Sequence, residues 1–382
     1  MLKITPESTR IHDMFMIALK ASKRLKNDTF INSTRTIKLK APPKFCPFSF
    51  DSSCDSTAKY RQIDGSCNNL ESGIVGRSAT PYKRLLKPAY DDGINEPRKN
   101  GVNGSPLPNP RSISIALHEP SDIPTKISNL GVMFGQFIDH DFALTATTGS
   151  GSPFKCSCDQ SSTSDCINIP TPDEDTLDSD QQCMGLTRSG ASFSKFDCTL
   201  DAREQSNLLT HWLDLSQLYG SDPSTQSTLR SFSNGRLKTS TARDFSRDFL
   251  PTANSGTCVD ESGDEMCFQS GDVRTSQNLM LVSIHTIFLR EHNRIARALQ
   301  RLNPAWTDES LYQEAKRVVN AEYQNVLYNE WLPILIGQNL YNSLGLAMES
   351  QRYFMGYNSS VNPHLSAEFA TAAFRFGHSL VI

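Results

Sequence analysis

The stretch Leu130–Phe142 has the sequence LGVMFGQFIDHDF, and the interpretation of the whole chain starts from it. Its seven apolar side chains suit a buried helix. Within such a helix Gln136 and His140 share a face, whereas Asp139 and Asp141 point to nearly opposite sides. A buried carboxylate is costly unless it is paired, hydrogen-bonded or metal-bound. The pattern predicts two sites on two sides of one helix, although a surface turn that ends a core helix also fits it.

The length and composition of the chain are compatible with one large globular domain or with two domains of ordinary size. The chain has 382 residues, of which 37% are hydrophobic, and a formal net charge of -3. This near balance of charge gives no reason to expect a nucleic-acid partner. No run approaches the roughly 18 apolar residues of a membrane span, and no secretory hydrophobic region is visible near Met1.

Ten cysteines indicate an oxidising compartment. They lie in sequence rich in Ser, Asp and Gly rather than in helical runs. Zinc binding is the weaker alternative, because no CxxC pair occurs. We therefore expect a secreted protein whose start is missing or misassigned. Four sequons agree with a glycoprotein: Asn27, Asn32, Asn103 and Asn358.

Two disulfides are predicted from short spacing across loops with turn residues, namely Cys54–Cys67 and Cys258–Cys267. Cys46 is left to pair with one of five cysteines whose own pairing stays open. Those five are Cys156, Cys158, Cys166, Cys183 and Cys198.

Residues 1–50 differ from the rest of the chain, since they carry ten Lys and Arg against three acidic residues. A short amphipathic helix over Asp13–Lys26 is expected there. The segment is either a leader or pro-segment, or a basic surface arm. Residues 51–382 are expected to form the main domain.

Inside this domain two regions are rich in loops, one from Cys54 and one over residues 146–200. Helical periodicity alternates with them and predicts a mainly α-helical domain with long disulfide-stapled loops. The expected helices start near Pro124, cover Ser276–Leu302, run from Asp308 (with Thr307 as N-cap) to Leu332 before Pro333, and cover Ala367–Ile382.

Oxygen donors recur at every second residue in THWLDLS, residues 210–216. They are the side chains of Thr210, Asp214 and Ser216 and the carbonyl group of Trp212. An extended loop turns alternate positions to one side, and calcium takes six to eight oxygen ligands. The alternative is an ordinary helix start that contains an aspartate.

Two further motifs carry cationic or titratable groups. In GDVRTSQ, residues 271–277, Arg274 precedes a helix, where a positive charge is unfavourable unless an anion or a polarised oxygen lies nearby. A surface arginine paired with Asp272 is the alternative. In AAFRFGHSL, residues 372–380, His378 follows Gly377, which permits a close backbone approach, and shares a face with Arg375. A hydrogen-bonded core histidine is the alternative there.

Together these motifs resemble the animal-type haem peroxidases, the superfamily of myeloperoxidase, thyroid peroxidase and peroxidasin. The resemblance runs from about Cys54 to Ile382 and rests on motifs in family order. They are GQFIDHD, LDLSQLYGS, GDVR, IFLREHNRIA and FRFGH, with KYRQIDGSCNN and RLLKPAYDDG in addition. The family's helical fold is therefore expected, truncated at the C-terminus because the chain stops four residues after His378.

The resemblance implies a b-type haem. His140 resembles the distal acid/base, Arg274 its cationic partner, and Gln136 the distal glutamine that hydrogen-bonds water or halide. His378 matches the proximal iron ligand, and Arg375 the arginine that meets a haem propionate.

Further family ligands match this sequence as well. Asp139 aligns with the aspartate that forms an ester with a haem methyl group. A calcium ion is implied, with the ligands Asp141, Thr210, Trp212, Asp214 and Ser216. Two positions depart from the family pattern. Gln277 stands where a second ester needs a glutamate, and Asn278 stands where myeloperoxidase has a haem-bonded methionine.

The function implied is reduction of hydrogen peroxide with oxidation of phenolic, halide or pseudohalide donors. One alternative is a catalytically silent, peroxidase-like extracellular adhesion or structural protein, or a fragment unable to retain haem. Metal-dependent hydrolysis at the Asp-His-Asp cluster is another, but it lacks a second carboxylate-rich motif. The sequence does not indicate an oligomeric state.

Overall fold

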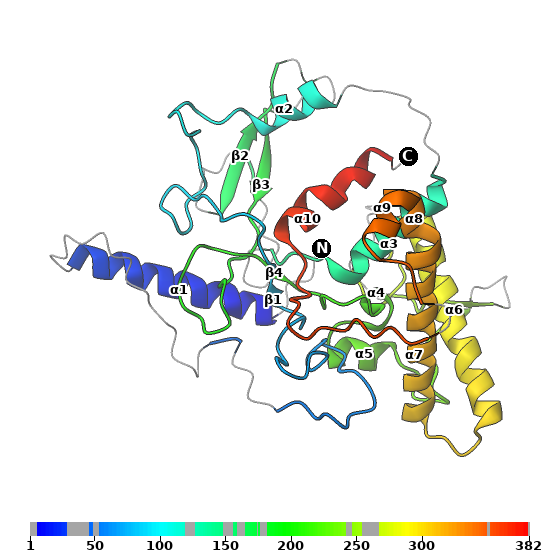
Figure 1. The fold of residues 1–382 in the computed structure, drawn as a ribbon. Helices are drawn as coiled ribbons and strands as arrows, with labels where there is room; N and C mark the ends of the chain where they lie inside the picture. The colour runs from blue at the N-terminus through cyan, green and yellow to red at the C-terminus, as the bar shows by residue number, and fades with distance from the viewer. Residues whose placement is uncertain are drawn as a thin grey trace.

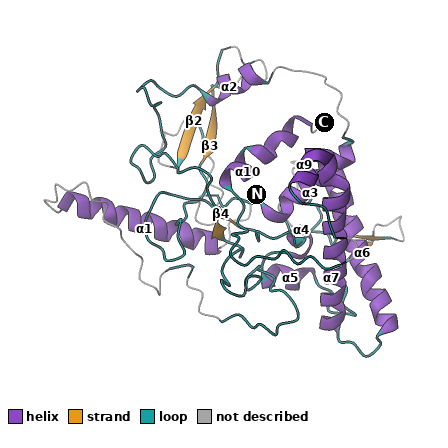
Figure 2. Cartoon of the chain, viewed as in Figure 1, coloured by secondary structure: helices purple, strands orange, loops and turns teal. Residues whose placement is uncertain are grey.

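The structure is a computed structural model that describes residues 6–28, 46–48, 53–118, 127–147, 156–158, 165–173, 175, 182–241, 247–253, 267–349 and 352–380. It is mainly α-helical with disulfide-linked loops, which confirms the predicted fold class (Figures 1 and 2).

The α-helices are α1 (Pro6–Asp28), α2 (Pro110–Leu117), α3 (Asn129–Phe142), α4 (Ser216–Tyr219), α5 (Pro223–Leu229), α6 (Leu279–Leu302), α7 (Asp308–Asn325), α8 (Leu332–Ile336), α9 (Gln338–Ser343) and α10 (Ala367–Thr371). A π-helical turn, η2 (Val326–Trp331), joins α7 to α8, and a 3-10 helix, η3 (Ala373–Leu380), follows α10. The strands are β1 (Thr80–Pro81), β2 (Cys166–Pro170), β3 (Cys183–Thr187), β4 (Ser206–Asn207), β5 (Ser240–Thr241) and β6 (Asp248–Phe249). They form three antiparallel pairs, β1 with β4, β2 with β3 and β5 with β6.

The main hydrophobic core lies where α3 packs against α4, α6 and α7. Phe137 of α3 is fully buried, and its ring stacks on Phe288 of α6 at a centroid distance of 5.2 Å. Tyr323 of α7 meets the same ring edge-on at 6.0 Å. Burial of aromatic side chains from three helices fixes the position of α3. This matters for function because α3 carries the motif that the sequence singled out.

Helix α3 begins at Asn129, and the hydroxyl group of Ser128 caps it by accepting a hydrogen bond from the Gly131 amide. The start expected near Pro124 lies outside the described residues. Leu130 is 57% exposed, so the first turn is not part of the core as predicted. Gly135 faces Trp331 of η2, whose indole nitrogen donates to the Gly131 carbonyl at 2.9 Å.

The helix predicted from Asp308 begins as expected, with Thr307 as its N-cap. The prediction that it stops before Pro333 is wrong, because η2 leads directly into α8, which contains that proline. Pro333 lies in the first turn of α8, where backbone N–H groups have no partner within the helix. The proline is therefore tolerated. Helix α6 begins three residues later than predicted because Asn278 caps it.

The single helix expected over Ala367–Ile382 is instead two elements. Helix α10 ends at Thr371, Ala372 adopts a non-helical conformation, and η3 continues to Leu380. The rings of Phe369 and Phe374 stack at a centroid distance of 4.9 Å. Residues five apart lie roughly 140° apart around a continuous α-helix, so the break permits this stacking.

Helix α1 is longer than the predicted Asp13–Lys26 segment and packs on a second core. Ile11, Phe15 and Leu19 lie on one face and are buried. The ring of Phe15 meets that of Phe193 edge-on at 5.5 Å. The N-terminal segment is thus attached to the main domain through apolar contacts.

Four disulfides have both cysteines within the described residues, and they confirm the Cys54–Cys67 pair. Cys46 pairs with Cys198, one of the five candidates. Cys267 is disulfide-bonded, and Cys258 lies outside the described residues. The region expected to be loop from residue 146 to 200 contains the β2–β3 hairpin, which two disulfides hold, Cys156–Cys166 and Cys158–Cys183. Cross-linking of this kind stabilises strands too short to persist alone.

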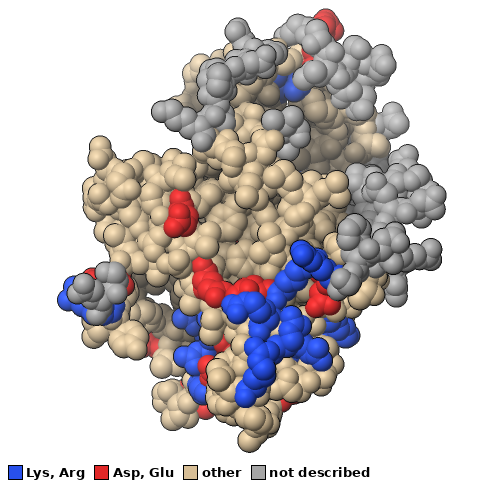
Figure 3. Space-filling view, turned by 90° about the vertical axis from the view of Figure 1, so that its right-hand side faces the viewer, with Lys and Arg blue, Asp and Glu red and all other residues tan. Residues whose placement is uncertain are grey.

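The surface that carries α6 shows a column of Lys and Arg side chains (Figure 3). None of the helices in the described ranges is long and apolar enough to cross a membrane.

Candidate active site

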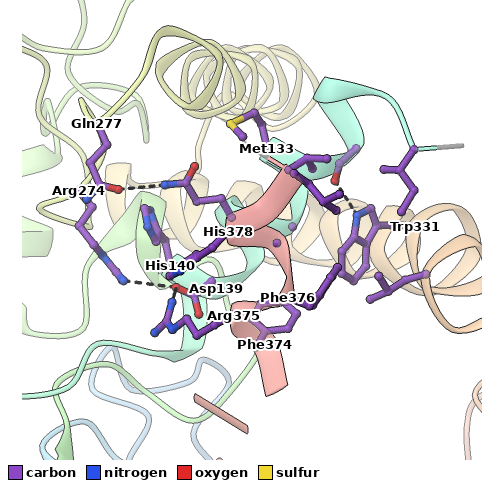
Figure 4. A pocket seen from close by; sticks show the side chains of 18 residues that line it. Met133, Asp139, His140, Arg274, Gln277, Trp331, Phe374, Arg375, Phe376 and His378 are labelled. Carbon is purple, nitrogen blue, oxygen red and sulfur yellow. Dashed lines mark hydrogen bonds and ion pairs between the residues drawn. The ribbon is translucent and has the colours of Figure 1, made fainter. Parts of the chain in front are cut away.

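A cavity lies between α3, the turn before α6, the η2–α8 segment and η3 (Figure 4). The space that it encloses is about 910 Å³ when the open solvent at its mouth is included. It is lined by all six residues predicted to act on haem, although they come from three separate segments of the chain. They are Gln136, Asp139, His140, Arg274, Arg375 and His378.

Gln136 and His140 both face this cavity from α3, as their spacing of four residues predicts. His140 is 2% exposed. Burial, followed by the nearby charge of Arg274, lowers the pKa of His140 well below its ordinary value, which favours the neutral imidazole. Its Nδ1 atom has no hydrogen-bond partner within the described residues. The closest carboxylate oxygen, on Asp272, lies 3.8 Å away.

The side chain of Asp272 holds Arg274 in place. The carboxylate of Asp272 accepts hydrogen bonds from the backbone N–H, Nε and Nη2 of Arg274 at 2.8, 2.8 and 2.9 Å. Burial would raise the pKa of Asp272, but the charge of Arg274 and these hydrogen bonds lower it to about 2. Arg274 is therefore a buried, paired cation at the cavity and not the surface arginine of the alternative interpretation.

A glycine sets the position of this pair. A Cβ atom at Gly271 would collide with the carbonyl group of Ser216 and the amide of Gly220. The backbone of Asp272 also donates to the carbonyl group of Gln217 at 3.0 Å. The segment that carries Arg274 can therefore lie directly against α4.

Asp139 faces the cavity between two arginines. Its Oδ2 atom lies 3.2 Å from Arg375 and 3.5 Å from Arg274. Burial raises the pKa of Asp139, and both arginines oppose that rise. Oδ1 is buried without a hydrogen-bond partner in the described structure.

Three amides form a chain at the edge of the cavity. Gln136 donates from Nε2 to Gln277 Oε1 at 3.0 Å and accepts from Asn278 Nδ2 at 3.1 Å. Gln277 and Asn278 are the positions that depart from the family pattern. Here they hold the side chain of Gln136 in place.

His378 lies on η3, in the cavity wall and away from the core. The predicted close approach at Gly377 is not seen, because a Cβ atom there would meet nothing within 4 Å in the described structure. His378 is an exposed side chain and not the hydrogen-bonded core histidine of the alternative interpretation.

On the other side of α3, Asp141 joins the 210–216 loop. Ser216 donates from its backbone to Asp141 Oδ1 at 2.6 Å and from its hydroxyl group to the Asp141 carbonyl at 2.5 Å. Thr210 Oγ1 lies 2.9 Å from Asp214 Oδ2 and 3.5 Å from the carbonyl oxygen of Trp212. The five predicted calcium ligands therefore gather around one buried place, opposite to Asp139.

The charges at this place are unbalanced. Burial and the proximity of Asp214 raise the pKa of Asp141 well above its ordinary value. Burial likewise raises the pKa of Asp214 to about 6, against the charge of Lys316. Asp141 Oδ2 and Asp214 Oδ1 are buried without a hydrogen-bond partner within the described residues. Two adjacent buried carboxylates with free oxygens, beside a hydroxyl and a carbonyl group, fit a calcium ion.

The residues that line the cavity also fit a cofactor, in this case haem. The cavity brings imidazoles from two segments and two arginines to one space, and Nδ1 of His140 is left unpartnered in the described structure. The residues therefore fit a bound haem with anionic propionates.

Sequence reasoning missed three contributors. The sequence interpretation considered Asp272 only as the partner of a surface arginine. Its spacing of two residues from Arg274 was the feature that could have indicated its role in holding that side chain. Lys316 acts on Asp214 from α7, and Trp331 packs on α3 from η2. No local pattern in the sequence indicates either of these two.

Comparison with known proteins agrees with this geometry. The sequence profile of the family described as "Animal haem peroxidase" matches residues 60–382. The chain is 39% identical to a chorion peroxidase of Aedes aegypti over 94% of this chain and 46% of that protein. It is 35% identical to a peroxidase of Drosophila melanogaster over 86% of this chain and 49% of that protein. Peroxidase A of Dictyostelium discoideum has a similar structure, with a TM-score of 0.65 and 27% identity over 84% of this chain and 60% of that one. The chain thus spans less than half the length of these two curated relatives.

Proposed function

The chain belongs to the animal haem peroxidase family, and from this premise we propose that it acts as a haem peroxidase that reduces hydrogen peroxide. The observation that carries the proposal is the cavity shared by His140, Arg274 and His378. A buried neutral imidazole beside a fixed cation suits proton transfer within a peroxide.

The proposal assigns haem to this cavity. His378 would bind the haem iron, and Arg375 would pair with a propionate. Asp139 lies beside both arginines and would form an ester with a haem methyl group. This bond replaces a C–H bond of the methyl group, and one hydrogen peroxide would accept the two electrons and two protons released, giving two waters. Bound haem would supply the two electrons that reduce the peroxide.

The residues of the chain would handle the proton and the charge. His140 would take a proton from one peroxide oxygen and deliver it to the other. Arg274 would stabilise the negative charge that develops on the leaving oxygen, without reorganisation, because Asp272 already holds its guanidinium group. Gln136 would hydrogen-bond water or a halide, oriented by Gln277 and Asn278.

We propose calcium at Asp141, Thr210, Trp212, Asp214 and Ser216. The ion would neutralise two buried carboxylates and join α3 to the loop before α4. Because Asp141 follows His140 directly, this link would also fix the distal imidazole.

The electron donors are proposed to be phenols, iodide, bromide or thiocyanate. Asn278 provides no thioether for a sulfonium link to haem, so chloride oxidation of the myeloperoxidase kind is not expected. Secretion is proposed from the disulfides and from relatives that include a chorion peroxidase. N-glycosylation is proposed from the four sequons.

Titration of the purified protein with haemin tests the proposal. We expect a Soret band and peroxide-dependent oxidation of guaiacol. His140→Ala should keep the Soret band and lose most of the activity, whereas His378→Ala should weaken haem binding. A protein that gives no Soret band with haemin would support the silent, peroxidase-like alternative.

A further inference from the structure

Helix α6 carries four arginines on one face, which we call the arginine stripe. At 100° per residue, positions 290, 294, 297 and 301 fall within an arc of about 60° and extend about 16 Å along the helix axis. The stripe consists of Arg290, Arg294, Arg297 and Arg301. It contributes to the basic column in Figure 3, on the side of the molecule where Figure 1 places α6.

The stripe is only partly neutralised. Arg294 forms a two-pronged pair with Glu291 at 2.8 and 2.5 Å, yet its side chain remains 62% exposed. Arg297 is 42% exposed and reaches Asp248 only at 3.9 Å. Arg301 is exposed, and no carboxylate of the described residues lies within 4.0 Å of it. Two or more of the four cations are therefore available to a partner.

Neighbouring segments add to this charge. Arg247 is exposed and precedes β6, which contacts α6. Glu322 of α7 is a third carboxylate, close enough to act on Arg294. Within the described residues the stripe and Arg247 thus place five cations beside these three carboxylates, in a chain whose net charge is -3.

Arg290 donates from Nε to the Asp248 carbonyl group at 2.6 Å and lies over the ring of Phe249, so local contacts account for it. The row of four like charges still has a cost for the helix. Each neighbouring pair in the stripe, at a spacing of three or four residues, places like charges together and destabilises the helix by about 0.2–0.5 kcal/mol. An ordinary exposed face would alternate signs. All four cations are arginines, whose planar guanidinium groups bind sulfate or phosphate with two hydrogen bonds.

We propose that the arginine stripe binds a linear sulfated polysaccharide. A single anion would occupy one arginine, whereas a straight row about 16 Å long suits an extended chain of repeated sulfates. Polysaccharide is chosen over nucleic acid because the disulfides fit an oxidising compartment, so this choice rests on the proposed secretion. The binding itself is independent of haem and of peroxidase activity.

The test measures binding of the purified full chain to heparin by isothermal titration calorimetry over a series of salt concentrations. The variant Arg297→Gln/Arg301→Gln removes two charges from exposed helix positions where glutamine preserves helix propensity. The matched control Arg98→Gln/Lys99→Gln removes two exposed charges elsewhere. Circular dichroism should show that all three proteins are equally folded.

We expect wild type and control to bind heparin alike, and the stripe variant to bind at least about tenfold more weakly, because two charge-assisted contacts are lost. Affinity should fall steeply as salt rises. Equal weakening in the control, or equal binding of desulfated heparin, would overturn the proposal. Tighter binding of single-stranded DNA or of anionic lipid vesicles than of heparin would overturn the choice of partner.

Discussion

The carboxylate of Asp272 accepts three hydrogen bonds from Arg274 while one of its oxygens lies 3.8 Å from Nδ1 of His140. Asp272 thus lies next to both His140 and Arg274, the two groups that the proposed mechanism uses. Its own position depends on Gly271, which lets the chain lie against α4. Since Ser216 of α4 also contacts Asp141, the two proposed sites share one framework.

Asp272→Asn should lower kcat/KM for hydrogen peroxide in the haem-loaded protein by about tenfold to a hundredfold. The amide leaves a buried guanidinium group with poorer acceptors, and hydrogen bonds to charged groups are worth roughly 1.5–3 kcal/mol. Stopped-flow reaction with peroxide measures the effect. Asp201→Asn, at an exposed carboxylate, is the control. Unchanged kinetics of Asp272→Asn would show that Asp272 does not position Arg274.

Removal of calcium should lower the melting temperature and disturb the haem spectrum. A ligand present at 100 times its Kd stabilises the folded state by about 2.7 kcal/mol. Differential scanning fluorimetry with chelator, with excess calcium and with excess magnesium measures this. Asp214→Asn should reduce the calcium response, whereas Asp222→Asn, the same change at the N-cap of α5, where asparagine also caps a helix, should leave the response unchanged. Identical melting temperatures and Soret bands in chelator and in calcium would refute the calcium site.

Stability should fall below pH 6.5 because of a buried histidine that joins two distant segments. Nε2 of His364 accepts from the Gly76 amide at 2.9 Å, and Nδ1 faces the Pro81 carbonyl at 2.7 Å, so the ring is neutral. Burial lowers the pKa of His364 to about 4, and the hydrogen bond with Pro81 opposes this. The ring also stacks on His211, and Lys83 acts on its charge.

A pKa lowered in the folded state means that the stability is fully present above the ordinary pKa of 6.5 and is lost as the pH falls through about 4. The loss is up to about 3 kcal/mol for such a shift. The pKa values of His285 and His292 are also lowered, each to about 4, so they act in the same direction. Urea unfolding at several pH values should show this decline, and His364→Gln should flatten it. An identical pH dependence in wild type and His364→Gln would exclude His364 as a source of the decline.

The sequence predicts this fold where the signal is local. The apolar periodicity of α3, the Thr307 cap and the short Cys54–Cys67 loop depend on neighbouring residues, and all three are present. Prediction from the sequence is wrong where contacts between residues far apart in the chain determine the conformation. The break at Ala372 accompanies the ring stacking of Phe369 and Phe374, a contact that the helical periodicity of this stretch does not predict.

The site residues show the same division. The opposition of Asp139 and Asp141 follows from helix geometry alone, and the structure has it. The approach of Lys316 to Asp214 brings together residues about a hundred positions apart and leaves no periodic trace. The position of Asp272 depends on the close contact between Gly271 and α4, and no local sequence pattern predicts that contact.

Haem should be attached by at most one ester, through Asp139. Gln277 provides an amide, which is a poor nucleophile, and its oxygen already accepts a hydrogen bond from Gln136 at 3.0 Å. After incubation with haemin and peroxide, denaturation and digestion, mass spectrometry should find haem on the peptide that contains Asp139 and on no other. Asp139→Ala should release all haem under denaturing conditions.

Gln277→Glu supplies the missing carboxylate at the same place in the cavity wall, so it should add a second haem-bearing peptide. Gln300→Glu makes the same chemical change on the outer surface of α6, where Gln300 contacts Asn234, and should add none. This pair separates the effect of position from that of charge. Haem bound to the Gln277 peptide in the wild type, or covalent haem retained by Asp139→Ala, would contradict the single ester, because an unmodified amide cannot form that bond.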